Sequence, residues 1–403
     1  MRIALVAPHA TAISPQSPAE EGTGVVTLAR TLGRLGHKVT VYARKDAPTQ
    51  PRKQTLDPGV IVEHVPAGPA APVPADQLKP HIRDFSEYLA ARWRRNPPDL
   101  AHAHFWLSGL AALAGARGRD VPVVQTFGAP APDGRSERLR PGQKVRLGET
   151  LPGIRLKASL ARNVRGVLAR TSQEMQEVAA WGVPRTAISV VPWGVDTEQF
   201  VPEGPAARRN GRPRLLTVSQ LGTTTEADPV VRALVEVPDA ELVIAGGPRH
   251  AELDDNRPHR SLAKLAAELG VADRVSFTGA VSMRDLPALL RSADLLVSQA
   301  WEEPHGTIAL QAMACGTPVI GPPAGSYQDA VIDGTTGLLV PPGHPSLLAR
   351  RIRALLASPA QLQAFGVAAA DRARARYSWD RVGQETVRAY ERCLAAHVPG
   401  RAA

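Results

Sequence analysis

One stretch of the sequence combines a carboxylate with the start of a helix: W-E-E-P-H-G-T-I-A-L-Q-A-M-A-C-G-T-P-V-I, residues 301–320. Glu303 stands before Gly306, and the apolar spacing that follows predicts a helix over Thr307–Ala314. The first turn of a helix has backbone N–H groups without partners inside the helix, and the helix dipole favours negative charge there. A carboxylate beside such a helix end suits the hydroxyls and phosphates of a sugar donor.

Two histidines, His102 and His104, lie in the predicted strand Leu100–His104 near its C-terminal end. Ligands of open α/β sheets approach the C-terminal ends of the strands, so both rings are candidate polar groups of a site. The alternative, that either ring is a structural histidine with satisfied hydrogen bonds, stays open. The sequence contains no D-x-D motif and no His/Asp cluster with ligand spacing. We therefore predict no metal ion and no other cofactor.

Segments of strand length alternate with segments of helical periodicity around these residues. In the first half, strands are predicted at Arg2–Ala7, Lys38–Ala43, Val60–Val65, Leu100–His104, Val121–Phe127, Gly166–Arg170 and Ile188–Val191. In the second half, strands are predicted at Arg214–Val218, Ala240–Ala245, Arg274–Thr278, Leu295–Ser298 and Pro318–Ile320. This alternation predicts an α/β protein with two Rossmann-like, doubly wound parallel sheets.

The chain of 403 residues is long enough for two or three domains. The best linker candidate is P-E-G-P-A-A-R-R-N-G-R-P, residues 202–213, because Pro, Gly and charge replace apolar periodicity there. We expect an N-terminal domain over 1–201, a C-terminal domain over 214–376, and a final helical segment over 377–403.

Composition narrows the class of protein. Hydrophobic residues make up 43% and charged residues 21%, which is typical of a soluble globular enzyme. The two cysteines, Cys315 and Cys393, are far apart and indicate a reducing cytoplasm. No apolar run of about 18 residues predicts a membrane span. The first strand is too short for a signal peptide. We expect a cytoplasmic protein that does not bind nucleic acid.

The net charge of +10 is unevenly spread. Asp133–Arg170 carries ten Lys or Arg against three acids, a local charge of +7 (10 − 3). One interpretation is a solvated basic helix face. The other is a surface that attracts an anionic acceptor or the acidic headgroups of the inner membrane face.

The segment that begins at Glu303 resembles the donor-binding signature of the family 4 retaining glycosyltransferases of the GT-B fold. That signature is written E-x7-E and is followed by A-M-A-x-G-T-P-V. Six further segments resemble the same family in its order along the chain. They are G-H-K-V-T-V-Y (36–42), H-A-H-F-W-L-S-G-L (102–110), V-P-W-G-V-D-T-E-Q-F (191–200), A-G-G-P (245–248), R-V-S-F-T-G (274–279) and D-G-T-T-G-L-L-V-P-P (333–342).

The resemblance implies two Rossmann-like domains that face each other across a cleft. It implies transfer of a hexose-type sugar with retention, from a nucleotide sugar bound by the C-terminal domain to an acceptor on the N-terminal side. It also implies that the last helix packs back on the N-terminal domain.

The resemblance assigns roles to the matching positions. Glu303, which would contact the donor sugar, and His102 are the catalytic candidates, and Phe277 and Thr278 would form the rim of the base pocket. The full set of donor-binding candidates is Gly22, Gly24, Gln220, Thr225, Phe277, Thr278, His305, Gly306, Thr307 and Gln311. The acceptor-side candidates are His104 and Gly128.

Four of these positions depart from the family pattern. Gln220 and Thr225 stand where the family has an Arg and a Lys that clamp the diphosphate. Gln311 replaces the second glutamate, which accepts hydrogen bonds from the ribose, and Gly128 replaces a frequent acceptor-side histidine. Loss of two cations beside a developing dianion should cost on the order of 10³-fold in rate.

Arg232, Arg249 and His250 are candidate replacements for the missing cations. The sequence does not place them at the phosphates. The alternative prediction is therefore a catalytically impaired GT-B pseudoenzyme or a binding protein.

Overall fold

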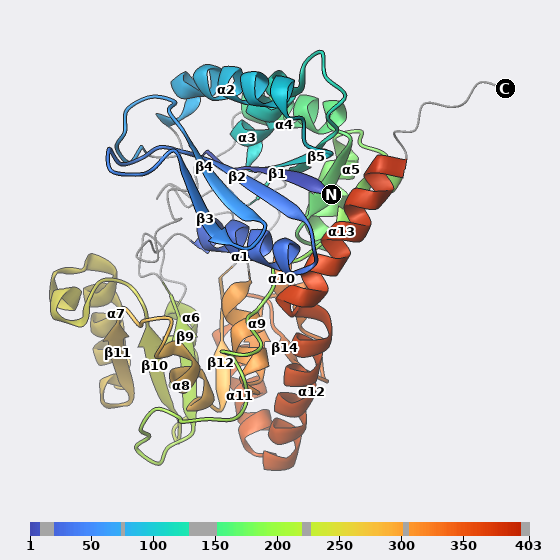
Figure 1. Ribbon diagram of the computed structural model, residues 1–403. Helices are drawn as coiled ribbons and strands as arrows, with labels where there is room; N and C mark the ends of the chain where they lie inside the picture. Colours follow the sequence, from blue (N-terminus) through green and yellow to red (C-terminus); the bar gives the residue numbers. More distant parts are fainter. Residues whose placement is uncertain (9–19, 74–76, 129–150, 220–226, 301–305, 396–403) are drawn as a thin grey trace. The chain divides into compact units, whose positions relative to one another are not determined.

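The computed structural model describes residues 1–8, 20–73, 77–128, 151–219, 227–300 and 306–395. These residues divide into two compact units. The first comprises the described residues of 1–193 together with 379–395, and the second comprises those of 194–378. Each unit is built on a sheet with helices on both faces (Figure 1).

The described residues of the first unit form an eight-stranded sheet in the order β3-β4-β2-β1-β5-β6-β7-β8. Its strands are β1 (Arg2–Val6), β2 (Lys38–Arg44), β3 (Lys53–Asp57), β4 (Val60–Val65), β5 (Leu100–His104), β6 (Val123–Thr126), β7 (Gly166–Ala169) and β8 (Ile188–Val190). All neighbouring strands pair in parallel except β3, which runs antiparallel to β4. The strand order reverses at β1, as in a doubly wound sheet.

The central strand β1 separates two cores because its side chains alternate between the two faces of the sheet. The helices of this unit are α1 (Glu20–Arg34), α2 (Ile82–Arg95), α3 (Trp106–Ala116), α4 (Leu151–Asn163), α5 (Ser172–Ala180) and α13 (Trp379–Ala395). Ile3 and Leu5 pack with residues of α1 and α13, whereas Ala4 and Val6 pack with residues of α2 and α3. The last helix of the chain therefore belongs to the core of the first unit.

The second unit has a six-stranded parallel sheet in the order β11-β10-β9-β12-β13-β14. Its strands are β9 (Arg214–Val218), β10 (Glu241–Ala245), β11 (Val275–Gly279), β12 (Leu295–Val297), β13 (Val319–Gly321) and β14 (Gly337–Leu339). Its helices are α6 (Asp228–Leu234), α7 (Arg257–Glu268), α8 (Leu286–Arg291), α9 (Thr307–Ala314), α10 (Gly325–Ala330), α11 (Pro345–Leu356) and α12 (Pro359–Tyr377). Leu215 of β9 packs with α6, α7 and α11, whereas Leu216 packs with α8, α9 and α12.

Two strands were not predicted from the sequence. β3 reads K-Q-T-L-D and has no buried residue, so it lacks the apolar pattern that identifies a strand. β14 has three residues, which is too short for a period to be recognised. Both lie at the edge of their sheets, where the core constrains a strand least.

The units divide at Trp193–Gly194, so residues 194–201 belong to the second unit. The segment 202–213 that the sequence marks as a linker also belongs to the second unit and packs on it. The Ala207 N–H donates to the carbonyl of Ala288, and the Arg291 guanidinium donates to the carbonyl of Pro205.

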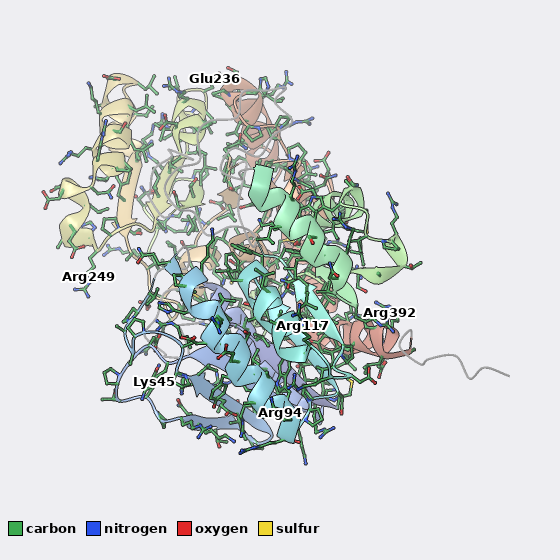
Figure 2. All side chains as sticks on the ribbon, turned by 90° about the horizontal axis from the view of Figure 1, so that it is seen from above. Lys45, Arg94, Arg117, Glu236, Arg249 and Arg392 are labelled. Carbon is green, nitrogen blue, oxygen red and sulfur yellow. The ribbon has the colours of Figure 1, made fainter. Side chains whose placement is uncertain are left out.

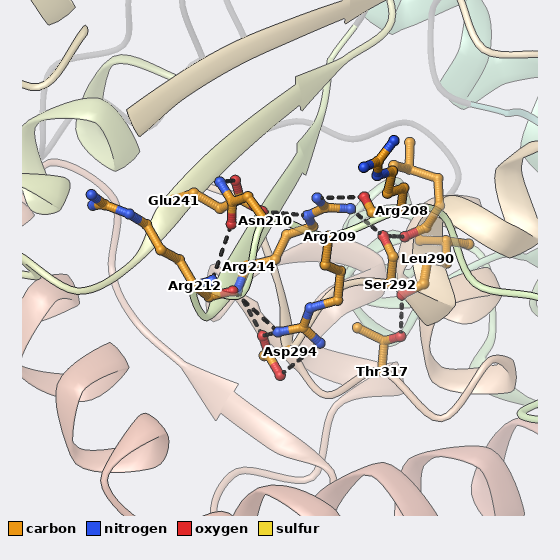
Figure 3. A network of polar contacts seen from close by, with 11 residues as sticks. Arg208, Arg209, Asn210, Arg212, Arg214, Glu241, Leu290, Ser292, Asp294 and Thr317 are labelled. Atoms are coloured by element: carbon orange, nitrogen blue, oxygen red, sulfur yellow. Dashed lines mark hydrogen bonds and ion pairs between the residues drawn. The ribbon is translucent and has the colours of Figure 1, made fainter. Parts of the chain in front are cut away.

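A buried polar network fixes the end of that segment to the N-terminal edge of the second sheet (Figure 3). Arg214, at the start of β9, donates through Nε to Glu241 at 2.7 Å and through Nη1 to Ser292 at 2.8 Å. The side chains of Arg214 and Glu241 are each 8% exposed. Arg209 forms an ion pair with Asp294, and Asn210 donates to Glu241. This network lies at the edge opposite to the C-terminal strand ends.

Candidate active site

Helix α9 is the first helix after strand β12 in the chain. Gly306 is its N-cap residue and has a left-handed backbone (φ +60). An added Cβ at this position would stand 2.2 Å from Oγ of Ser326. Glycine is therefore required twice, by the backbone angle and by the close approach of α10. Glu303 and His305 lie outside the described residues.

Thr307 and Gln311 stand one turn apart on α9, so they share a face of the helix. Both are partly exposed, whereas Ala309, Leu310 and Met313 are buried. The structure therefore brings together three of the predicted donor-binding residues, Gly306, Thr307 and Gln311. Gln220 and Thr225, the two uncharged residues predicted at the diphosphate, lie outside the described residues.

Two of the candidate replacement cations, Arg232 and Arg249, are exposed. Arg232 lies on α6, and Arg249 follows β10 on the surface of the second unit (Figure 2). No phosphate contact can be assigned to either from its surroundings.

The predicted rim of the base pocket lies on the edge strand β11. Phe277 is partly buried against the core beneath it, and its ring meets the ring of His259 edge to face at 4.4 Å between centroids. The hydroxyl of Thr278 donates to the carbonyl of Gly279 at 2.8 Å. Phe277 also lines a surface pocket together with His250.

In the first unit, His102 is fully buried and both of its ring nitrogens have partners. Nδ1 lies 2.7 Å from the hydroxyl of Tyr390, and Nε2 lies 2.9 Å from Oγ1 of Thr126. Thr126 donates its one hydroxyl proton to the carbonyl of Leu168 at 3.0 Å, so it must accept from His102. Nε2 therefore carries the proton, and Nδ1 accepts from Tyr390.

This arrangement favours the structural alternative for His102. Burial, together with the charge of Arg170, lowers the pKa of His102 well below its ordinary value, so the ring is neutral. Burial also raises the pKa of Tyr390, which stays a hydrogen-bond donor. With no free nitrogen, His102 holds β5, β6 and α13 together and cannot transfer a proton to a substrate without losing these bonds.

His104, two residues further along β5, faces the same way and is 3% exposed. Its ring lies 4.1 Å from that of His102 and is stacked on Trp193 at 6.5 Å between centroids. Trp193 also packs on Gly24 of α1, where an added Cβ would stand 2.5 Å from the indole ring. The apolar spacing of Val25–Leu35 predicts a helix that follows a loop over Pro8–Gly24, whereas the structure has Gly22 and Gly24 inside helix α1. Gly24 is thus required for packing on Trp193.

The backbone at the end of β5 was not predicted from the sequence. Among the non-glycine residues described, only Phe105 has a positive φ (+74). Its N–H donates to the carbonyl of Thr126, and its carbonyl accepts from the amide of Gln125 at 3.1 Å. Gly128, an acceptor-side candidate, has φ +68 at the end of the neighbouring strand β6. No sequence signal marks Phe105, because phenylalanine rarely adopts this conformation.

The basic segment Asp133–Arg170 is described from residue 151 onward. Arg155, Arg162 and Arg165 are exposed, in keeping with a basic surface. Arg170 is 6% exposed, and its guanidinium lies 3.9 Å from the centroid of the Trp193 ring. Arg170 therefore takes part in packing and does not contribute to a solvated surface.

Among the residues that the structure describes, no group of three or more His, Cys, Asp or Glu side chains could hold a metal ion. In the same ranges of the chain, no helix is long and apolar enough to cross a membrane.

The sequence matches two families of known proteins, one in each half. Residues 22–199 match the family described as Glycosyltransferase Family 4, and residues 204–372 match that described as Glycosyl transferases group 1. The gap between the two matches, residues 200–203, overlaps the start of the predicted linker 202–213.

Similar proteins match nearly the whole chain. D-inositol 3-phosphate glycosyltransferase of Streptomyces bingchenggensis is 30% identical, with 98% of this chain and 92% of the relative covered. The protein of the same description from Frankia alni is 33% identical, with 94% of this chain and 98% of the relative covered.

Solved structures share the fold at lower identity. Sucrose-phosphate synthase from Thermosynechococcus elongatus has a TM-score of 0.81 and 24% identity, over 98% of this chain and 99% of the other. Anabaena HepE in complex with UDP-glucose has a TM-score of 0.69 and 18% identity, over 97% of this chain and 99% of the other.

Proposed function

Because the chain belongs to the group 1 and family 4 glycosyltransferases, enzymes of the GT-B fold, we propose that it transfers a hexose-type sugar from a nucleotide sugar to an anionic acceptor, with retention. In this reaction the bond between sugar C1 and the diphosphate oxygen breaks. A bond between C1 and an acceptor oxygen forms, and the proton of the acceptor hydroxyl leaves with the nucleoside diphosphate.

The observation that carries the proposal is the start of α9. The left-handed backbone of Gly306 leads the chain into α9, and the first turn of a helix directs backbone N–H groups outward from its N-terminal end. A helix end of this kind stabilises negative charge that develops on a departing diphosphate. Thr307 and Gln311 lie on one face of α9 beside this helix end. Glu303, three residues before Gly306 in the sequence, is the proposed contact to the donor sugar.

The donor is proposed to be a UDP sugar in the first instance. Anabaena HepE, which shares the fold, has been solved in complex with UDP and with UDP-glucose. A carboxylate at Glu303 would accept hydrogen bonds from sugar hydroxyls, which are common to all hexoses. These observations support a nucleotide-linked hexose as the donor, and they do not select one hexose over another.

The acceptor is proposed to be a phosphorylated polyol. The relatives of similar length are described as acting on D-inositol 3-phosphate, which is anionic. Of the basic segment Asp133–Arg170, the exposed residues Arg155, Arg162 and Arg165 support an anionic acceptor, because exposed cations raise the local concentration of such a substrate. Binding to the acidic headgroups of the inner membrane face remains a second use for the same charge.

Calorimetric titration with UDP-, GDP- and TDP-glucose tests the proposal. We expect one of these donors to bind with a Kd in the range of about 1 µM to 1 mM, as for typical enzyme substrates. If no nucleotide sugar binds, the chain is better described as a non-catalytic GT-B protein. That is the alternative suggested by Gly128, Gln220, Thr225 and Gln311.

A further inference from the structure

A band of positive charge lies where the helices of the first unit lead into its strands. Each connection runs from the last four residues of a helix to the first residue of the next strand. In the described part of the unit these connections are 31–38, 92–100, 113–123, 160–166 and 177–188. Together they contain ten Lys or Arg and three Asp or Glu, a charge of +7 (10 − 3). We call these five connections the basic edge.

The second unit has the opposite charge at the equivalent place. Its described connections, bounded in the same way, are 231–241, 265–275, 288–295, 311–319 and 327–337. They contain three Arg and eight Asp or Glu, a charge of −5 (3 − 8). Cations near a helix C-terminus complement the helix dipole, but this reason applies equally to both units. The helix dipole therefore does not explain the basic edge.

Hydrogen bonds and strand pairing join the basic edge into one band. The Met1 ammonium lies 3.1 Å from Nδ1 of His37, and Arg2 forms an ion pair with Asp99 at 2.9 Å, so these two residues join 31–38 to 92–100. The other connections lead into β6, β7 and β8, which pair in that order. Because neighbouring strands lie about 4.8 Å apart, the band from β2 to β8 is roughly 24 Å wide.

Five cations of the basic edge are exposed and make no side-chain hydrogen bond or ion pair with any described residue. They are Lys38, Arg94, Arg95, Arg117 and Arg185. Arg94 and Arg117, both labelled in Figure 2, lie at the ends of the neighbouring helices α2 and α3. A guanidinium group binds phosphate through two parallel hydrogen bonds, so four of the five are suited to phosphate groups.

The basic edge also exposes an apolar side chain. Leu35 follows the last residue of α1 and is 37% exposed, three residues before Lys38. Cations beside an exposed leucine are typical of surfaces that lie at the boundary between lipid headgroups and acyl chains. A nucleic acid offers phosphates without an apolar layer next to them. Leu35 therefore favours a lipid surface as the partner.

We propose that the basic edge is a docking surface for an anionic lipid bilayer. The free guanidinium groups contact headgroup phosphates, and Leu35 enters the boundary between headgroups and acyl chains. The basic edge lies at the N-terminal ends of the strands, whereas ligands approach such sheets at the C-terminal ends, where His104 and Gly128 stand. Docking therefore leaves the ligand edge open to a water-soluble acceptor, and the inference does not rest on the proposed function.

Sedimentation of the full chain with extruded vesicles tests the proposal. Vesicles of phosphatidylcholine alone are compared with vesicles that contain about 30% phosphatidylglycerol, at about 0.1 M and about 0.5 M NaCl. At the lower salt concentration we expect binding to the acidic vesicles to be at least about tenfold tighter than to the neutral ones. This binding should weaken at least about tenfold at the higher salt concentration, because salt screens exposed charges.

A triple variant removes the charge at the ends of α2 and α3. Arg94→Glu, Arg95→Glu and Arg117→Glu, combined in one chain, change exposed side chains that no described residue contacts through an ion pair. Binding to the acidic vesicles should weaken at least about tenfold. Calorimetric titration with UDP-glucose should give the wild-type Kd, which shows that the variant is folded.

Two controls lie on the second unit. Arg350→Glu, Arg351→Glu and Arg353→Glu on α11 change the net charge by the same amount at exposed positions and should weaken vesicle binding by less than about threefold. Leu35→Ser should weaken binding by about threefold to tenfold through the lost apolar contact. Val367→Ser, at a 58% exposed position of α12, should bind vesicles as the wild type does.

Several outcomes would overturn the proposal. Equal binding to neutral and acidic vesicles, or no binding to either, would do so. An equal loss in the α11 variant would show that net charge decides binding and not the basic edge. Tighter binding of a double-stranded oligonucleotide than of acidic vesicles at the same salt concentration would assign the basic edge to nucleic acid instead. None of these results affects the proposed sugar transfer, which the titration with UDP-glucose measures separately.

Discussion

For single residues, the sequence predicted the position in the fold but not the contacts of the side chain. The sequence placed His102 and His104 correctly in β5, near its C-terminal end. It could not show that both rings turn inward, because that depends on Tyr390 and Trp193, which are distant in sequence. The partner of His102 Nδ1 is 288 residues away. Residue type and spacing therefore placed both histidines near the C-terminal end of β5 without showing the direction of their side chains.

The neutral state of His102 predicts how stability depends on pH. Burial lowers the folded-state pKa below the unfolded value of 6.5, so the unfolded chain binds more protons between these two values. The free energy of unfolding should therefore fall as the pH drops below about 6.5, by up to about 1.4 kcal/mol per pH unit. In His102→Gln, the free energy of unfolding should depend less steeply on pH in this range, because the titrating group is removed.

Urea unfolding at about pH 7.5 and about pH 5.5 measures the difference between the wild type and His102→Gln. The pKa of His37 is also lowered, by burial and by the charge of the N-terminus, but this histidine is present in both proteins. Identical slopes in the two proteins would show that His102 is not the group responsible.

For helices and strands, the sequence predicted the bounds that depend on local pattern but not the contacts with elements distant in the chain. The sequence predicted α9 with the bounds found, Thr307–Ala314, because its apolar spacing ends sharply at a Cys-Gly pair. It could not predict the contact between Gly306 and Ser326, which comes from a helix that follows β13. The exposed strand β3 was missed for a different reason, since its residues carry no buried pattern at all.

The start of α9 should tolerate no side chain at its N-cap. Gly306→Ala imposes a left-handed backbone on alanine and brings its Cβ against Ser326, so we expect a loss of about 1–3 kcal/mol in the free energy of unfolding. Donor affinity should fall as well, because the first turn of α9 shifts. Chemical unfolding and calorimetric titration with UDP-glucose measure the two effects.

Gly334→Ala is the matched control. Gly334 also has a positive φ (+74), but an added Cβ there would have no neighbour within 4 Å. Gly334→Ala should lower the free energy of unfolding, because alanine is strained at a positive φ, but it should not change donor affinity. If the two variants bind donor equally well, the start of α9 does not form the donor site.

At the scale of the whole molecule, both sheets were predictable because their strands are apolar runs separated by helical periods. The order of the strands was not, since it depends on pairing between distant segments such as β1 with β5. The ionic network at the N-terminal edge of the second sheet was also missed. Its members are scattered over residues 208–294, and charged residues in a linker-like segment normally predict exposure.

The network around Arg214 and Glu241 should stabilise the fold without affecting donor binding. Glu241→Ala leaves the Arg214 guanidinium buried without its carboxylate, which should cost about 3–5 kcal/mol in the free energy of unfolding. The double variant Arg214→Met, Glu241→Leu should lose much less, because no buried charge is left unpaired. Donor affinity should be unchanged in the folded double variant, and a large change there would argue against a purely structural role.

Independence from metal ions remains a prediction for the whole enzyme. It rests on the lack of a D-x-D motif in the sequence. In the described part of the chain, no acidic or histidine cluster of ligand type occurs either. Sugar transfer should therefore proceed at an unchanged rate after dialysis against EDTA. Loss of activity that added Mg²⁺ or Mn²⁺ restores would show that a metal ion serves the diphosphate.

The most direct test of the central claim compares two adjacent glutamates in a transfer assay. Glu303→Ala and Glu302→Ala are incubated with UDP-glucose and D-inositol 3-phosphate, and the glycosylated product is measured against the wild type. We predict that the wild type and Glu302→Ala form product, whereas Glu303→Ala forms essentially none. Near-normal turnover by Glu303→Ala would contradict the assignment of the sugar site to the residues before α9.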